Sequence, residues 1–127
     1  MKIAIDTNRY VDFMKGEAGV VGQLQRAEKI ILPFVVAAEL RAGFLAGDRR
    51  QQNERILVRF LNSRRVSIFY PDENTTPYYA QLFQQLRQQG TPIPTNDIWI
   101  AAIALQHNLI LYTRDIHFKN LPQIPQI

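Results

Sequence analysis

Four short apolar runs that alternate with helical patterns constrain the fold of this chain more than any other feature. They cover residues 2–5, 30–32, 67–70 and 109–112. A short apolar run closed by turn residues is typical of a core strand in a parallel sheet. The alternation therefore predicts a doubly wound α/β domain with a mostly parallel sheet.

The segments between these runs carry the helical patterns. We expect helices over residues 9–15, 19–28, 34–45, 48–65, 76–89 and 98–107. The last of these is apolar nearly all round, which indicates burial on more than one side. The tail 118–127 contains two prolines and is expected to lie against the body as a short edge piece. A chain of 127 residues is long enough to bury a core, so we expect one domain over 1–127.

Composition excludes several kinds of site. The chain has no cysteine, which rules out disulfides, zinc–thiolate sites and cysteine nucleophiles. Only His107 and His117 offer imidazole, so a metal site must be built mainly from oxygen, which suits Mg²⁺ or Mn²⁺. The net charge of +4 is compatible with a nucleic-acid partner and equally with an ordinary surface. With no signal peptide and no apolar run near the ~20 residues of a membrane span, we expect a cytoplasmic protein.

Carboxylates stand where the predicted strands end. Asp6 follows the first strand, Asp97 begins the apolar helix, and Asp115 follows the last strand. Right-handed crossovers bring the carboxyl ends of parallel strands to one side, where open α/β sheets bind ligands. Glu39 is a fourth candidate, a charge inside an apolar helix without a local partner. Acids gathered in one crevice repel one another unless a cation neutralises them, so the pattern predicts a metal site.

Each of these acids also has a structural interpretation. Asp6 and Asp97 are good helix caps, and Asp115 can fix a turn through its side chain. Glu39 is harder to explain in this way, because glutamate is rarely buried unless it is paired. The remaining acids lie in polar or loop-like surroundings and are interpreted as solvated surface: Asp12, Glu17, Glu28, Asp48, Glu54, Asp72 and Glu73.

Four stretches of the chain each contain one of the candidate acids. They are Ile5–Asn8, Val36–Gly43, Asn96–Ala102 and Tyr112–Phe118. In this order they resemble the PIN-domain ribonucleases, most closely the VapC-type toxins of prokaryotic toxin–antitoxin pairs. The resemblance spans essentially the whole chain and implies a three-layer α/β/α PIN-like domain with a mostly parallel central sheet of four to five strands.

The resemblance also implies a function and a set of site residues. Such proteins are Mg²⁺- or Mn²⁺-dependent endoribonucleases that hydrolyse RNA phosphodiester bonds. The acids that match their catalytic metal site are Asp6, Glu39, Asp97 and Asp115, and the polar residues that match its support are Thr7, Asn8 and Thr113. Arg114 and Arg9 are candidates for contact with substrate phosphate. His117 stands where many relatives carry another acid, and we interpret it as a turn or surface histidine.

Partners follow from the same resemblance. The substrate is expected to be a structured RNA such as transfer RNA or ribosomal RNA. We also expect a homodimer, held inactive by a VapB-like antitoxin, and no membrane partner. The arginines on and after the 48–65 helix could hold RNA phosphate or form a solvated face. The apolar face of 48–65, with Phe44 and Leu45 upstream, could receive the antitoxin or belong to the core.

Other classes of protein also gather acids at strand ends. A receiver-like phosphoacceptor domain requires an acceptor aspartate directly after a middle strand and a lysine after a late strand. Here the middle strand ends in Tyr70–Asp72, and Arg114 follows the late one. A haloacid-dehalogenase-type phosphatase requires aspartate at position 8, which is Asn8. A non-catalytic PIN-like interaction module is the third alternative, and the presence of all four acids argues against it.

Overall fold

A four-stranded parallel sheet organises the computed structural model, which describes residues 1–127. The strands are β1 (Lys2–Ile5), β2 (Lys29–Pro33), β3 (Val66–Phe69) and β4 (Ile110–Tyr112). Their order across the sheet is β3-β2-β1-β4, and every neighbouring pair is parallel. The four predicted strands and their parallel arrangement are therefore confirmed, with ends that move by at most one residue.

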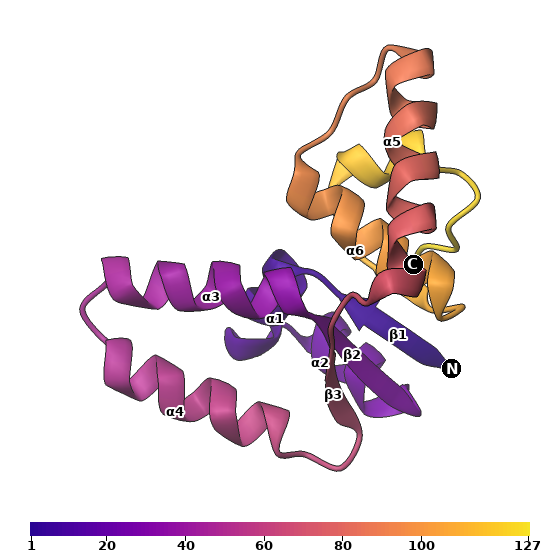
Figure 1. Cartoon of the computed structure of the whole chain (residues 1–127). Helices are drawn as coiled ribbons and strands as arrows, with labels where there is room; N and C mark the ends of the chain where they lie inside the picture. The colour runs from indigo at the N-terminus through magenta and orange to yellow at the C-terminus, as the bar shows by residue number, and fades with distance from the viewer.

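Six helices surround this sheet (Figure 1). They are α1 (Thr7–Met14), α2 (Ala18–Arg26), α3 (Phe34–Ala46), α4 (Arg50–Leu61), α5 (Thr76–Gln89) and α6 (Thr95–Gln106). Two short 3₁₀ turns, 73–75 and 116–120, complete the secondary structure. In Figure 1 the α3–α4 hairpin extends to one side of the sheet, while α5 and α6 lie together on the other side. The three-layer α/β/α architecture is thus confirmed.

Local chemistry explains where the helices begin and end. Helix α1 begins two residues before the predicted start, because the Asp6 carboxylate caps it by accepting the backbone N–H of Arg9 at 3.0 Å. Helix α5 ends at Gly90, whose φ of +69° lies in the left-handed region that glycine adopts without a steric penalty. Helix α6 begins at Thr95, three residues before the predicted start, directly after Pro94.

The core lies where α6 packs on the strands. Helix α6 buries the run Ile100–Ala104 almost completely, which confirms the prediction of burial on more than one side. The tail lies along β4: the Leu111 N–H donates to the Pro125 carbonyl at 2.8 Å, and the Ile127 N–H donates back to Leu111 at 3.0 Å. The tail is therefore an edge piece, as predicted. None of the helices combines the length and apolar character that a membrane span requires.

The sheet order decides where ligands can reach the protein. Strand β1 lies between β2 and β4, which are parallel to it, so the carboxyl ends of all three strands meet at one edge. The chain leaves β1 at Asp6 and leaves β4 at Thr113, so these two residues come together there although 107 positions separate them. This edge is the crevice in which an open α/β sheet binds its ligands.

Candidate functional site

Asp6 sits at the end of β1 and is only 5% exposed. Its carboxylate accepts the Arg9 backbone N–H, and it also accepts a hydrogen bond from the Thr113 hydroxyl at the end of β4. Burial raises the pKa of Asp6, and the negative charge of Asp115 raises it further. The cap interpretation is therefore confirmed, and the same carboxylate also lies within the influence of Asp115.

Asp97 lies in the first turn of α6, but its side chain does not cap the helix. Its Oδ2 atom is instead 2.9 Å from the Nδ1 atom of His117. Burial raises the pKa of Asp97, and the charges of Asp115 and Glu39 raise it as well, against the hydrogen bond from His117. The cap alternative for Asp97 is therefore wrong, since its carboxylate points toward the other acids.

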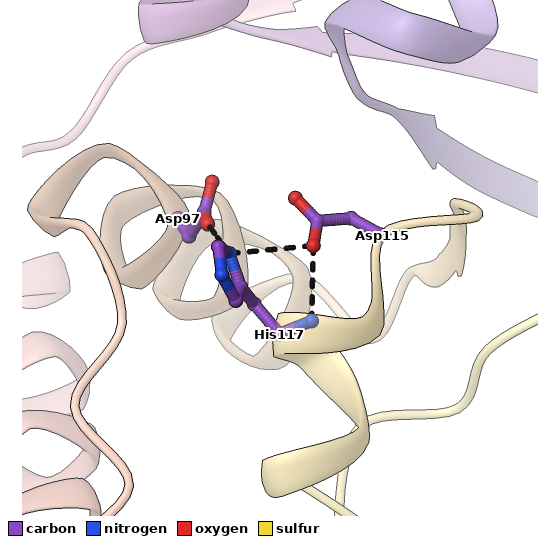
Figure 2. Close-up of side chains that lie close together, drawn as sticks. All are labelled: Asp97, Asp115 and His117. Carbon is purple, nitrogen blue, oxygen red and sulfur yellow. Dashed lines mark hydrogen bonds and ion pairs between the residues drawn. The ribbon is translucent and has the colours of Figure 1, made fainter.

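Asp115 and His117 form the other side of the same group (Figure 2). The Asp115 Oδ1 accepts the His117 backbone N–H at 2.9 Å, so the predicted turn role is confirmed. The same oxygen lies 3.3 Å from the Nδ1 atom of the His117 ring. The ring of His117 therefore sits between two carboxylates, a placement that the turn-or-surface interpretation missed. The only available signal was its position in the turn that Asp115 opens.

Glu39 is exposed on α3 rather than buried. The Thr7 hydroxyl donates to its Oε1 atom at 2.8 Å. The expectation of a buried, unpaired glutamate is wrong because residues 38 and 39 lie on the outer face of an otherwise apolar helix. The charge nevertheless reaches the site, since it contributes to the raised pKa of Asp97. Asn8 lies exposed beside Thr7 at the start of α1.

We call the four acids Asp6, Glu39, Asp97 and Asp115 the acidic cluster. Ligand atoms of Asp97, Asp115 and His117 all lie within 4.8 Å of one another. The donor set is mainly carboxylate oxygen, so these residues fit Mg²⁺ or Mn²⁺.

Asp12 is the largest departure from the sequence interpretation. It was assigned to the solvated surface, but it is 2% exposed on α1. Arg114 binds it through two hydrogen bonds, Nε to Oδ2 at 3.0 Å and Nη2 to Oδ1 at 3.3 Å, and Arg9 adds a contact from Nη1 at 3.3 Å. These hydrogen bonds and charges hold the pKa of Asp12 below its usual value. Both substrate-binding candidates therefore converge on one buried acid.

The remaining arginines divide into structural and exposed groups. Arg65 donates to the backbone carbonyls of Leu24 and Ala27 at 2.9 and 2.6 Å, so it joins β3 to the end of α2. Arg41 pairs with Glu54 across the α3–α4 hairpin at 2.9 Å. The other arginines of the 48–65 segment are exposed: Arg49, Arg50, Arg55, Arg59 and Arg64.

A groove of about 520 Å³ lies between α3 and α4. Phe44 and Leu45 provide its apolar surface, and Leu45 is 64% exposed. Leu57 on α4 is fully buried in the core. The apolar residues of this hairpin are therefore shared between the core and an open groove, which confirms core burial for Leu57 and leaves Phe44 and Leu45 at the groove.

Comparison with known proteins gives the same family from sequence and from structure. A PIN domain family model matches residues 3–124. Ribonuclease VapC1 of Haemophilus influenzae strain R2866 is 32% identical over 116 residues, which cover 88% of this chain and 85% of that protein. Ribonuclease VapC2 of Rickettsia felis is 33% identical over 102 residues, which cover 80% of this chain and 75% of that protein.

Solved structures extend the match to the whole fold. VapBC2 from Rickettsia felis, bound to a DNA fragment from their promoter, superposes with a TM-score of 0.88 at 30% identity and covers 100% of this chain and 98% of that one. VapBC-1 from nontypeable Haemophilus influenzae gives 0.88 at 26% identity, with coverage of 100% and 97%. The chain therefore belongs to the PIN-domain family, among its VapC ribonucleases. This family membership replaces the receiver-like and phosphatase alternatives.

Proposed function

We propose that this protein is the toxin of a toxin–antitoxin pair, a Mg²⁺- or Mn²⁺-dependent endoribonuclease of the cytoplasm whose residues 1–127 act as one nuclease domain. One observation carries the proposal. Four segments that are distant in sequence bring carboxylates together at the carboxyl ends of parallel strands, where burial and mutual repulsion raise the pKa of Asp6 and of Asp97. Together with the VapC relatives, this concentration of carboxylates supports a metal-dependent site for a phosphate substrate.

The proposed roles follow the contacts of each side chain. Asp6 and Asp97 are the main metal ligands, because burial and neighbouring negative charge make both carboxylates depend on a cation. Glu39 and Asp115 complete the site directly or through water. A bound Mg²⁺ or Mn²⁺ would activate a water molecule and shield the phosphate charge.

The supporting residues orient these acids. Thr113 donates to Asp6 and accepts the Asp115 backbone N–H at 2.9 Å, so its hydroxyl fixes two members of the acidic cluster. Thr7 holds Glu39 in the same way from the first turn of α1. Asp115 is also available to accept a proton from the attacking water, since one of its oxygens has no protein donor.

The proposed partners are a structured RNA and a small antitoxin. Solved relatives are VapBC complexes, which supports a VapB-like antitoxin for this chain. The groove beside Phe44 and Leu45 is open enough to receive an apolar segment, and the exposed arginines of α4 border it. A homodimer is part of the same proposal.

Cleavage of bulk transfer RNA by the purified protein tests the proposed activity. The protein is incubated with Mg²⁺, with Mn²⁺ or with EDTA, and the Asp6→Asn and Asp97→Asn variants are run in parallel. We expect metal-dependent cleavage that leaves 5′-phosphate ends and is lost in both variants. Cleavage that persists in EDTA, or that survives both substitutions, would contradict the proposal. Asp48→Asn, an exposed acid of the α3–α4 loop, is the matched control.

A further inference from the structure

Asp12 is the one buried acid that the acidic cluster does not use. It lies on α1, six residues after Asp6, and two guanidinium groups converge on it from opposite ends of the chain. A buried carboxylate is satisfied by one cation with good geometry. Here the pair Arg9 and Arg114 leaves one positive charge in excess beside the acidic cluster. That excess needs a further explanation.

The two arginines bind Asp12 in different ways. Arg9 is largely enclosed, with its side chain 18% exposed and its guanidinium 4.3 Å from the centre of the Tyr112 ring. Arg114 uses only the Nε–Nη2 edge of its guanidinium, and its side chain is 54% exposed. Its Nη1 group, with two N–H donors, is therefore not committed to Asp12. Arg114 makes the main contact with the buried charge and still presents donors to solvent, while Arg9 adds a second cation.

The sequence places these free donors at the rim of the acidic cluster. Arg114 lies between Thr113, which donates to Asp6, and Asp115. The hydrogen bond to Asp12 is the main cause of the raised pKa of Arg114, and the negative charge of Asp6 adds to it. A planar guanidinium held on one edge is well suited to bind a phosphate through its other edge.

We infer that Asp12 is a positioning residue for the substrate: it fixes the Arg114 guanidinium so that its free N–H groups bind an RNA phosphate next to the cleaved bond. This inference rests on the proposed ribonuclease function. A fixed side chain binds more tightly than a mobile one, because its conformational entropy is already lost before the substrate arrives. Asp12 itself does not touch the substrate.

A double-mutant cycle on Asp12→Asn and Arg114→Ala tests the inference with bulk transfer RNA. The apparent KM and kcat are measured for both single variants and for the double variant. We expect each single substitution to raise KM roughly tenfold, with kcat changed by no more than about twofold. The double variant should be no weaker than Arg114→Ala alone, because Asp12 acts through Arg114. Thermal unfolding is measured for every variant, so that the kinetics can be compared at a temperature at which all of them are folded.

A second measurement reads binding without cleavage. In an Asp97→Asn background with Mg²⁺, end-labelled transfer RNA is titrated at several salt concentrations and its fluorescence anisotropy is followed. Loss of one phosphate contact should lower the slope of log K against log salt by about 0.7 to 0.9 for both Asp12→Asn and Arg114→Ala. A purely structural role of Asp12 would leave this slope unchanged. The matched controls are Arg26→Ala and Asp48→Asn, two exposed residues outside the site.

Three results would overturn the inference: an unchanged KM and salt slope in Arg114→Ala, an effect of Asp12→Asn that adds to that of Arg114→Ala, or a loss confined to kcat. Failure of the proposed function gives a different result. In that case the unmodified protein would not cleave RNA with any metal, while the anisotropy titration would still report whether Asp12 and Arg114 share one phosphate contact.

Discussion

Two groups of buried or half-buried carboxylates lie close together in this protein and are stabilised in opposite ways. Asp12 has its cations supplied by the chain, from Arg9 and Arg114. No guanidinium group binds the carboxylates of the acidic cluster, and burial and mutual repulsion raise the pKa of Asp6 and of Asp97. The first arrangement serves the folded state, and the second is costly until a cation arrives from outside. The contrast separates an acid whose charge the chain itself compensates from acids whose charge calls for an external cation, without reference to any relative.

Substitution within the acidic cluster should have the largest effect on activity. We expect Asp97→Asn to reduce RNA cleavage by more than about a hundredfold, because it removes a ligand charge from the metal site. Its free energy of unfolding at pH 7 should be unchanged or up to about 1 kcal/mol higher, because a repelled charge is removed. RNA cleavage and urea unfolding measure the two quantities, with Asp48→Asn as the control. A clear loss of stability in Asp97→Asn would show that the acidic cluster stabilises the folded state as Asp12 does, and the distinction between them would fail.

Substitution of Asp12 should have the opposite profile for stability. We expect Asp12→Asn to lower the free energy of unfolding by about 2 kcal/mol, because two guanidinium groups lose their charged acceptor. For a domain of this size the melting temperature should fall by roughly 5 to 10 °C. Thermal unfolding followed by circular dichroism measures the change. A melting temperature equal to that of the unmodified protein would show that Asp12 contributes no net stability.

The pH dependence of the free energy of unfolding should also distinguish the acidic cluster from Asp12. The folded pKa of Asp97 is raised above 3.8, so this residue opposes folding at neutral pH and stops doing so as the pH falls through its folded pKa. The folded pKa of Asp12 is lowered below 3.8, so its stabilising contribution is present above 3.8 and is lost as the pH falls through the lower value.

Urea unfolding between pH 7 and pH 3 tests this order. Any stability advantage of Asp97→Asn should disappear at a pH above the one at which the cost of Asp12→Asn begins to shrink. Each variant is compared with the unmodified protein at every pH, so that changes common to all three proteins cancel. The reverse order would contradict the assignment of the two groups.

The smallest effect should come from a third buried polar group, the hydroxyl of Tyr10. This hydroxyl is buried on α1 without a hydrogen-bond partner, and burial raises its pKa to about 12. We expect Tyr10→Phe to leave the free energy of unfolding unchanged or to raise it by up to about 1 kcal/mol, because no hydrogen bond is lost. The ring keeps its edge-on contact with Phe60 at 5.2 Å. A substantial destabilisation would indicate a partner for the hydroxyl, such as water.

Local patterns sufficed to predict the sheet and to single out all four acids of the cluster, although Glu39 was singled out on a burial that it does not have. Strand ends are marked by the change from apolar to polar residues, and parallel topology then brings Asp6, Asp97 and Asp115 to one edge. The exposure of Glu39 was not predictable, because its neighbours in sequence are apolar and only the packing of α3 decides which face is open.

The surroundings of Asp12 and His117 were not predicted, because the partner of the first is distant in sequence and the placement of the second depends on turn geometry. Arg114 reaches Asp12 across 102 positions, which no local pattern can report, although Arg9 at three residues' distance was an available signal. His117 reaches Asp97 across 20 positions, and only the turn after β4 aims its ring in that direction.

The hydrogen bond between Thr113 and Asp6 has a consequence for synthesis of the protein. It spans 107 positions, and Asp115 lies further on, so the acidic cluster cannot assemble until residue 115 has left the ribosome. At ordinary elongation rates, Asp6 and Glu39 emerge on the order of ten seconds before their partners. A chain that has not been made as far as Asp115 therefore carries no complete site, and the ribosome is not exposed to one before that point.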